Sequence, residues 1–413
     1  MTGTNNSYWL KTVPAWELDQ LPLPSYADIV VVGAGVMGST LAYWLARAGR
    51  KPLVIERNPS PAMGASGRNG GLMVQGSSFL YSEDIKRFGA NQAHAIYAFT
   101  QWNHRLVREV LSTEELDVGF KEVAHIRFAS DPADVEILQN TVAALREIDV
   151  EAQWVEGEAL SRAVGTEVGP QFKGALLRPN QGRVHSARYT YGITRAASLR
   201  GARFAFSTPV QSVEPNGSGW DIRTARTTIP ANQVVLALNA WSADLFPELE
   251  SIITPVRGHA AVTSPANWRM NSWSAENGFA YGRQLENGQL LFGGARNVRA
   301  DMEIGHHPLP GENVAPLVAE VVEALKQALP RYFPATADLK IEHVWTGNMG
   351  FTPDIIPLVG EWPNRTGLWL MTGFSGHGMC YSQAVPRALA DQIMGREGIQ
   401  IPTSFDPARY LDK

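Results

Sequence analysis

The stretch DIVVVGAGVMGSTLAYWLARAG, residues 28–49, decides the fold. Its first five residues are a β-branched run typical of a buried strand. The glycine turn GAGVMG follows at 33–38, and residues 39–48 carry apolar side chains at helical spacing before Gly49 ends the pattern. The run KPLVIE, at 51–56, predicts a second strand. Strand, turn, helix and strand in this order predict a βαβ unit of a parallel sheet.

Three glycines in the turn have the spacing of a dinucleotide-binding motif. Gly33 permits the tight turn, Gly35 lets the backbone approach a pyrophosphate, and Gly38 lets the helix pack against the strand. The helix N-terminus offers free N–H groups and a positive dipole end to the phosphates. Glu56 ends the second strand, eighteen residues after Gly38. A carboxylate there can accept hydrogen bonds from ribose hydroxyls and disfavours a 2′-phosphate.

The next loop favours a flavin dinucleotide over a nicotinamide dinucleotide. GASGRNGG, residues 64–71, begins eight residues after Glu56, and its glycines suit close backbone approach to a bulky second ring system. Nicotinamide-binding chains usually continue with further βαβ units. Arg68 lies in this loop, where it either supports the loop or makes a cationic contact near the flavin or the substrate.

Helix and strand patterns alternate at both ends of the chain, with a strand-rich region between them. Helical spacing predicts helices over about 83–112, 131–147, 188–199, 313–330 and 382–394, and residues 252–300 are rich in strand patterns. The expected fold class is α/β (α+β), with a Rossmann-like FAD-binding domain and an inserted antiparallel-sheet substrate domain. The predicted parts are an N-terminal arm at 1–27, a discontinuous FAD-binding domain at 28–82, 151–250 and 336–413, and a substrate-binding domain at 83–150 and 251–335.

Composition narrows the class of partner. Of 413 residues, 44% are apolar and 18% are charged, and the formal net charge is −4. Without a basic surplus, nucleic acid and anionic membranes are not expected partners. The longest apolar runs, such as 29–32 and 368–371, are too short to span a bilayer, and the first 26 residues lack a secretion-signal pattern. The one cysteine fits a reducing cytoplasm, so we expect a cytoplasmic protein without a membrane span.

No spacing of His, Cys, Asp or Glu predicts a metal site. The pair His306–His307 precedes a proline-rich loop, where a solvated surface pair is the expected interpretation.

Seven motifs together resemble one known group of proteins. They are, in order, DIVVVGAGVMGSTLAYWLARAG, GASGRNGG, VVLALNAWS, ITPVRGHAAVT, GRQLENGQLLFGGAR, WTGNMGFTPDIIPLVG and TGFSGHGM. They resemble the flavin-dependent amine and amino-acid oxidoreductases of the D-amino-acid oxidase, glycine oxidase and sarcosine oxidase superfamily. The branch that contains gamma-glutamylputrescine oxidoreductase is the most similar, and the resemblance covers nearly the whole chain after residue 25.

The resemblance implies FAD in an extended conformation, with the substrate between the flavin face and an antiparallel sheet. It places the pyrophosphate at the GAGVMG turn, the adenosine ribose at Glu56, the adenine at the backbone of Val210 and the isoalloxazine near residues 373–378. The implied cofactor-binding residues are Gly33, Gly35, Val36, Met37, Gly38, Glu56, Arg57, Ser66, Arg68, Asn69, Gly70, Val210, Asn239, Ala240, Trp241, Asp354, Gly373, Ser375, Gly376, His377, Gly378 and Met379.

The resemblance also shows two departures at reactive positions. The sarcosine oxidase branch bonds its flavin covalently to a cysteine in the segment written GNMGFTPD here, which has none, so FAD is expected to be non-covalent unless a histidine substitutes. Cys380 falls where that branch has a lysine for the substrate carboxylate, and its expected role is a small wall residue, since only His377 offers a partner to activate a thiolate. Leu291 stands where the sarcosine oxidase branch has a lysine that helps to activate O₂ for reoxidation of the flavin. The identity of the electron acceptor therefore stays open.

Candidate substrate-binding residues come from the strand-rich region and the last glycine loop. They are His259, Tyr281, Arg283, Arg296, Trp345 and Cys380. Arg283 or Arg296 can recognise a carboxylate if buried, although ordinary sheet or surface roles explain these residues equally well. His377, Arg68 and Tyr281 are the candidate catalytic residues. His377 either tunes the flavin or packs within its loop.

The implied reaction is oxidation of a C–N bond in a small amine or amino acid. Hydride transfer to FAD gives an imine, which water hydrolyses to a carbonyl compound and an amine or ammonia, and O₂ or another acceptor reoxidises the cofactor. Two alternatives from other classes are a nicotinamide-dependent dehydrogenase and a non-catalytic or accessory flavoprotein subunit of a larger dehydrogenase. The substrate and the oligomeric state stay open.

Overall fold

The computed structural model describes residues 6–17, 22–217, 219–305 and 316–411. The motif of residues 28–49 forms one strand of the first sheet and the helix that follows it. This sheet runs in the order β16, β17, β10, β1, β2 and β7, with β9 beside β10 and β8 beside β9. Its strands are β1 (Ala27–Val32), β2 (Leu53–Ile55), β7 (Arg203–Ala205), β8 (Val210–Asn216), β9 (Gly219–Thr224), β10 (Thr228–Leu236), β16 (Leu358–Glu361) and β17 (Leu368–Thr372).

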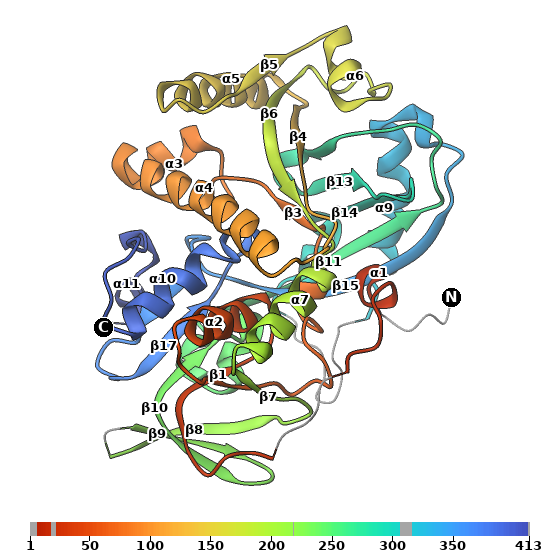
Figure 1. Cartoon of the computed structure of the whole chain (residues 1–413). Coiled ribbons are helices and arrows are strands. Elements are labelled where there is room, and N and C mark those ends of the chain that lie inside the picture. The colour runs from red at the N-terminus through yellow and green to blue at the C-terminus, as the bar shows by residue number, and fades with distance from the viewer. Residues whose placement is uncertain (1–5, 18–21, 218, 306–315, 412–413) are drawn as a thin grey trace.

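Parallel pairing at the centre of this sheet confirms the predicted βαβ unit. β1 pairs in parallel with β2 and with β10, and β10 pairs in parallel with β17. Val30 and Val31 are fully buried, because a parallel strand is covered on both of its faces. The helices α7 (Ser186–Leu199) and α10 (Ala384–Ile393) each pack against α2 (Val36–Arg47) beside the sheet (Figure 1).

A second, mostly antiparallel sheet lies above the first in Figure 1. It runs in the order β15, β11, β14, β13, β12, β4, β6 and β3, with β5 paired to β6, and β12–β4 is a parallel pair. Its strands are β3 (Leu72–Met73), β4 (Lys121–Ala129), β5 (Gln153–Val155), β6 (Gly174–Arg183), β11 (Thr254–Thr263), β12 (Ser272–Ala275), β13 (Ala280–Gln284), β14 (Leu290–Gly294) and β15 (Ile341–Phe351).

The remaining helices cover the outside of the two sheets. The helical pattern predicted over 83–112 is divided into α3 and α4, because Gly89 between them has a φ of +79° that a helix does not accommodate. The helices are α1 (Tyr8–Lys11), α3 (Tyr81–Phe88), α4 (Ala90–Thr113), α5 (Pro132–Glu147), α6 (Glu158–Val164), α8 (Ala300–Glu303), α9 (Ala319–Tyr332) and α11 (Ala408–Leu411).

The structure corrects the predicted organisation in two places. Residues 72–73, 153–183 and 341–351, which we assigned to the FAD-binding domain, supply β3, β5, β6 and β15 to the second sheet. Apolar periodicity identifies a strand but not the sheet it joins, because pairing depends on segments far away in the chain. The described part of the expected arm also carries the helix α1, whose Trp9 is buried. Residues 1–5 and 18–21 and the pair His306–His307 lie outside the described residues.

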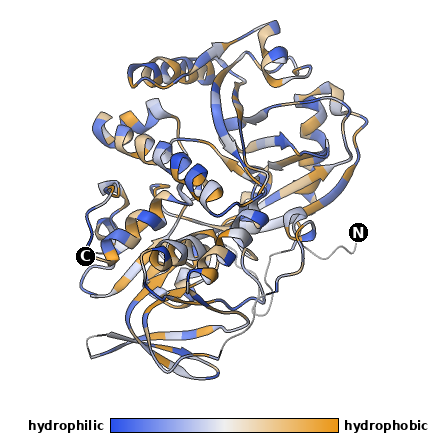
Figure 2. Ribbon diagram, in the orientation of Figure 1, coloured by the Kyte–Doolittle hydropathy of each residue, from blue (hydrophilic) through white to orange (hydrophobic). Residues whose placement is uncertain are grey.

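Hydrophobic residues lie along the strands beneath α2, whereas the outer helices α3, α4 and α5 mix hydrophobic and hydrophilic residues (Figure 2). Among the described residues, no helix combines the length and apolar character needed to cross a membrane.

Candidate active site

One cavity of about 800 Å³ has walls from both sheets. It reaches from the glycine turn before α2, past the loop of residues 62–70, to the loop of residues 374–380 and the strands β11, β13 and β4. The predicted site residues that line it are Gly33, Gly35, Val36, Met37, Glu56, Arg57, Ser66, Arg68, Asn69, Gly70, Val210, Asn239, Trp241, His259, Tyr281, Arg296, Ser375, Gly376, His377, Gly378, Met379 and Cys380.

The glycine turn is tight enough to require the absence of side chains. Gly33 has a φ of +107°, and a Cβ there would lie 2.8 Å from the Ala237 carbonyl oxygen. A Cβ on Gly38 would lie 1.9 Å from the Gly33 oxygen, so Gly38 permits the predicted close packing of α2 on β1 and does not line the cavity. Gly35 faces the cavity at the N-terminus of α2. This end of the helix is therefore open to an anion.

Glu56 lies at the end of β2 and already orders the nearby backbone. Its Oε2 accepts a hydrogen bond from the Ala34 N–H (2.8 Å), and its Oε1 accepts from the N–H and the side-chain amide of Asn58 (2.9 and 2.7 Å). These bonds fix the carboxylate beside the turn. Further along the same wall, the Arg57 guanidinium lies 4.8 Å from the ring centroid of Trp241.

The loop of residues 64–71 is held by its own side chains. Ser66 Oγ accepts from the Val36 N–H at the start of α2 (2.8 Å). Asn69 donates to the carbonyl oxygens of Ala65 and Ser66, while its Oδ1 accepts from the Gly71 N–H (2.7 Å). The loop is therefore organised by protein contacts, and its glycines leave room toward the cavity.

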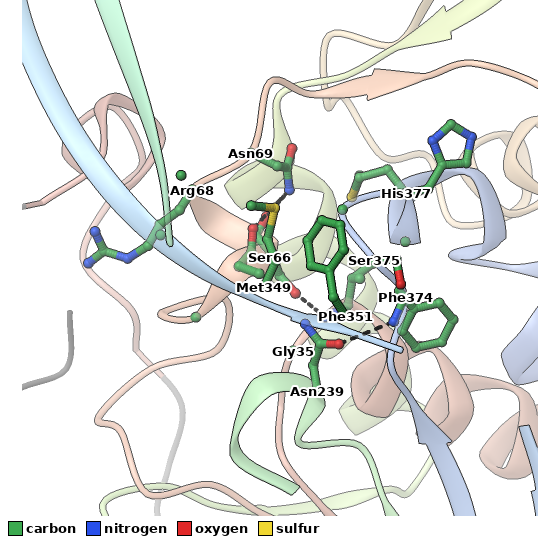
Figure 3. A pocket seen from close by; sticks show the side chains of 18 of the residues that line it. Gly35, Ser66, Arg68, Asn69, Asn239, Met349, Phe351, Phe374, Ser375 and His377 are labelled. Carbon is green, nitrogen blue, oxygen red and sulfur yellow. Dashed lines mark hydrogen bonds between the residues drawn. The ribbon is translucent and has the colours of Figure 1, made fainter. Parts of the chain in front are cut away.

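Arg68 supports this loop, which is one of its two predicted roles. Its Nε donates to the Met63 oxygen (2.9 Å) and its Nη1 to the Thr346 oxygen (3.0 Å). Burial lowers the pKa of Arg68 to about 10. In Figure 3 its guanidinium points away from the other labelled side chains. These contacts argue against a catalytic role for Arg68.

The loop of residues 374–380 faces the glycine turn across the cavity. Asn239, which has a φ of +48°, accepts from the Phe374 N–H through its Oδ1 (3.3 Å). The side chains of Met349 and Phe351 lie between this loop and the loop of Ser66 and Asn69 (Figure 3).

His377 and Cys380 are both tied to the carbonyl groups after β3. His377 Nε2 lies 3.1 Å from the oxygens of Val74 and Gly76, and Cys380 Sγ donates to the Val74 oxygen (2.7 Å). Burial lowers the pKa of His377 to about 4, with the nearby charge of Arg178 adding to this effect, and burial raises the pKa of the Cys380 thiol. Near neutral pH, His377 is uncharged and Cys380 is a protonated thiol. Neither is poised as a nucleophile.

Three predicted substrate contacts border the cavity on the second sheet. The Tyr281 ring packs over Gly70, where a Cβ would lie 2.7 Å from Cε2, and burial raises the pKa of Tyr281 to about 12. The Arg296 guanidinium lies 4.6 and 5.6 Å from the ring centroids of Phe279 and Phe351. His259 Nε2 accepts from a backbone N–H at residue 318 (3.0 Å), and burial lowers the pKa of His259 to about 4.

Six predicted residues lie outside the cavity wall. They are Gly38, Ala240, Arg283, Trp345, Asp354 and Gly373. Arg283 Nη1 donates to the oxygens of Gly71 and Val184 (2.8 and 3.0 Å), so its role is to join backbone segments. Trp345 Nε1 similarly donates to the Arg68 oxygen (2.8 Å).

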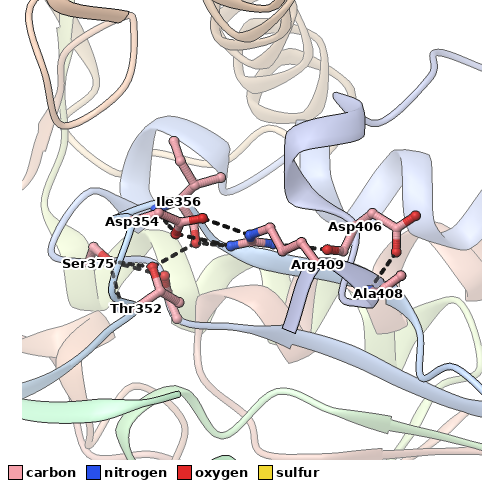
Figure 4. A network of polar contacts seen from close by, with 8 residues as sticks. Thr352, Asp354, Ile356, Ser375, Asp406, Ala408 and Arg409 are labelled. Atoms are coloured by element: carbon pink, nitrogen blue, oxygen red, sulfur yellow. Dashed lines mark hydrogen bonds and ion pairs between the residues drawn. The ribbon is translucent and has the colours of Figure 1, made fainter. Parts of the chain in front are cut away.

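Asp354 joins the C-terminal helix to the loop before β16 (Figure 4). Its Oδ2 accepts from Arg409 Nε (2.8 Å) and its Oδ1 from Arg409 Nη2 (3.2 Å) and the Ile356 N–H (3.0 Å). The family resemblance implied that Asp354 lies near the cofactor, because it belongs to the stretch that precedes the last glycine loop. The partner that turns its carboxylate away, Arg409, is 55 residues further along the chain.

The cavity also has lining residues that sequence reasoning missed. The omitted residues include His125, Arg127 and Arg178 on β4 and β6, together with Phe279, Met349 and Phe351. The sequence signal that could have identified them is the presence of charged residues within two strand patterns. Charged side chains on the buried face of a strand are rare unless they are paired or functional. The pairing of β4 with β6 that gathers them is not visible in the sequence.

Sequence comparison places the chain among flavin-dependent oxidoreductases. The sequence profile of the family described as FAD dependent oxidoreductase matches residues 28–392. The chain belongs to this family. A probable oxidoreductase, OrdL, of Haemophilus influenzae is 25% identical over 92% of this chain and 87% of that protein. Gamma-glutamylputrescine oxidoreductase of Escherichia coli is 25% identical over 96% of this chain and 90% of that protein. The predicted family resemblance is confirmed.

A solved structure confirms the fold class. The crystal structure of glycine oxidase from Geobacillus kaustophilus superposes with a TM-score of 0.80 at 23% identity, over 94% of this chain and 99% of that one. The family match also favours FAD over the nicotinamide alternative.

The residues present fit the FAD that the family uses. The glycine turn leaves space at the N-terminus of α2, Glu56 lies within reach of a ribose at the end of β2, and the cavity continues without a break to the loop of residues 374–380. Among the described residues, no cluster of three or more His, Cys, Asp or Glu side chains is arranged to hold a metal ion.

Proposed function

We propose that the protein oxidises the C–N bond of a small amine or amino acid, using FAD bound without a covalent link. The observation that carries this proposal is the single cavity that joins the dinucleotide turn to a polar pocket on the second sheet, lined by His259, Tyr281 and Arg296. A cofactor and a small substrate can therefore meet in one enclosed space. The names of several family relatives, which act on amines or amino acids, support the same class of substrate.

When bound, FAD would accept two electrons from the substrate as a hydride, namely the α-hydrogen with its electron pair. The amine thereby becomes an imine, which water hydrolyses to a carbonyl compound and ammonia or an amine. The chain's own residues bind and orient the substrate. The Tyr281 hydroxyl stays protonated, because burial raises its pKa to about 12, so it can donate a hydrogen bond. Arg296 supplies a positive charge that suits a carboxylate.

The reaction proposed here needs no charged histidine. His259 and His377 are neutral above about pH 5, because burial lowers the pKa of each to about 4. An amine that binds deprotonated requires no strong general base, and neutral imidazoles do not repel such a substrate. His377 Nε2 is already within hydrogen-bonding distance of two carbonyl oxygens, which supports a role in shaping the loop.

Non-covalent FAD is supported by the chemistry of the one cysteine. Cys380 is a buried thiol with a raised pKa, and the segment of residues 347–354 contains none. Acid precipitation should release all of the yellow chromophore into the supernatant. Colour that stays with the precipitated protein would contradict this part of the proposal.

Anaerobic mixing with a panel of amines and amino acids tests the proposed reaction. The flavin absorbance near 450 nm should bleach with at least one member of the panel. Admission of air then separates an oxidase, whose colour returns within seconds, from an enzyme that passes electrons to another acceptor. Leu291 has an uncharged side chain that is fully buried and does not line the cavity, so it cannot assist oxygen electrostatically. A flavin that no amine bleaches would favour the accessory-subunit alternative.

A cytoplasmic location is also part of the proposal and rests on the single cysteine.

A further inference from the structure

The face that β4 and β6 turn toward the cavity carries two arginines, Arg127 and Arg178. Arg178 is paired across the strands with His125, and Arg127 lies two residues along β4 on the same face. Diagonal neighbours of this kind have Cβ atoms about 7 Å apart, so both side chains reach one ligand. The two guanidinium groups therefore form one positively charged region of the wall.

Neither arginine has a carboxylate partner among the described residues. No hydrogen bond or ion pair joins Arg127 to any of them. Arg178 donates to the Gln75 oxygen (2.8 Å) through Nη1, while its buried Nε has no hydrogen-bond partner in the part of the chain that the structure describes. Glu83 is the acid on this part of the wall, but its Oε2 accepts from the Leu80 N–H at the start of α3 (3.1 Å) and it forms no ion pair with a described residue.

Two like charges placed together in a partly buried cavity are unfavourable without an anion. Burial lowers the pKa of Arg127 to about 10 and the charge of Arg178 acts in the same direction, while the charges of Glu83 and Asp134 act against it. An anion between the two guanidinium groups removes this repulsion, and the planar fork of arginine matches the two oxygens of a carboxylate. The dinucleotide phosphates do not supply this anion, because their binding turn lies on the first sheet at the start of α2.

This pair is distinct from the cation in the proposed function. The charged groups around Arg127 are Arg178, Glu83 and Asp134, whereas those around Arg296 are Tyr281 and Glu303. Arg296 belongs to the turn after β14 and lies against two aromatic rings. The cavity wall therefore carries a pair of cations on β4 and β6 and a further cation in the turn after β14.

We propose that Arg127 and Arg178 bind a second carboxylate of the substrate, so that the substrate is an amine carrying two carboxylate groups. This inference rests on the proposed function, in which Arg296 takes the first carboxylate. An amine with one positive charge and no carboxylate, or a diamine, fits this wall poorly, since it would face three arginines. The substrate class is thus narrowed from amines in general to amine dicarboxylates.

Calorimetric titration of the FAD-loaded protein tests the subsite without turnover. The probes are dicarboxylates from malonate to adipate, each compared with the monocarboxylate of the same carbon number at constant ionic strength. At least one dicarboxylate should bind ten times or more tightly than its monocarboxylate. Arg127→Gln and Arg178→Gln should each reduce that preference at least tenfold, whereas Arg162→Gln, on the exposed surface of α6, should leave it unchanged.

Equal affinity for both series, or a preference that survives both cavity variants, would overturn the proposal. Arg127 has no hydrogen bond to another described residue, so its variant decides the outcome if Arg178→Gln does not fold. Visible absorbance confirms that each variant retains FAD. Failure of every amine to bleach the flavin would refute the proposed function, while the carboxylate titration would still decide the subsite.

Discussion

Gly35→Ala should separate cofactor binding from folding. Gly35 has a φ of −69° and a ψ of 179°, which alanine adopts without strain, and the one close contact of an added Cβ is Ser66 Oγ at 3.0 Å. The added methyl group would occupy the space through which a phosphate reaches the N–H groups of α2. We therefore expect the variant to fold and to bind FAD weakly.

The size of the effect follows from the contacts that a displaced phosphate loses. Two hydrogen bonds to a charged acceptor contribute about 1.5–3 kcal/mol each, or about 3–6 kcal/mol together. The dissociation constant of FAD should therefore rise roughly 10²- to 10⁴-fold. Titration of apoprotein with FAD, followed by quenching of flavin fluorescence, measures this constant, and circular dichroism measures the melting temperature of the apoprotein.

Gly38→Ala is the matched comparison. Its Cβ would lie 1.9 Å from the Gly33 oxygen, and a backbone atom cannot move aside cheaply. This variant should lower the melting temperature of the apoprotein, whereas Gly35→Ala should not. A folded Gly35→Ala protein that binds FAD within threefold of wild type would refute the assignment of this turn to the phosphates.

Three further outcomes follow from single contacts. Asp84 is buried with a pKa raised to about 7 by burial, despite the hydrogen bond from Ser77, so its carboxylate destabilises the fold as the pH rises from 4 through 7. Asp84→Asn should therefore raise the melting temperature at pH 8 but not at pH 4, and equal shifts at both would contradict this. Cys380→Ser should change the rate of anaerobic flavin reduction, measured by stopped flow, by less than about threefold, since the thiol is protonated. A hundredfold loss of this rate would indicate that the thiol takes part in the reaction. Arg409→Ala leaves the Asp354 carboxylate without its arginine partner and should lower the free energy of unfolding by about 1–3 kcal/mol. The affinity for FAD should not change. Weaker FAD binding, measured by titration of the apoprotein, would instead indicate that Asp354 lies at the cofactor.

Local patterns predicted the glycine turn and the acid beside it, while their contacts with a dinucleotide stay a prediction. The turn of Gly33, Gly35 and Gly38 and the acid at Glu56 need only a strand, a helix and a fixed spacing between them. All four positions lie within 24 residues, so short-range geometry places them. The loop glycines near residue 376 were also identified from their own segment, and they line the same cavity.

The substrate end depended on contacts that no local pattern contains. Arg283, a predicted carboxylate ligand, instead bonds to the backbone at Gly71 and Val184, while Arg127 and Arg178 face the cavity. The side of the sheet on which a strand residue lies is set by register, and register is set by pairing with distant strands. The sequence by itself determined the family, the cofactor and the tight glycine turn, because these depend on neighbours along the chain. Only the tertiary structure decided which arginines face the cavity, because that depends on how β4, β6 and β14 are brought together across the second sheet.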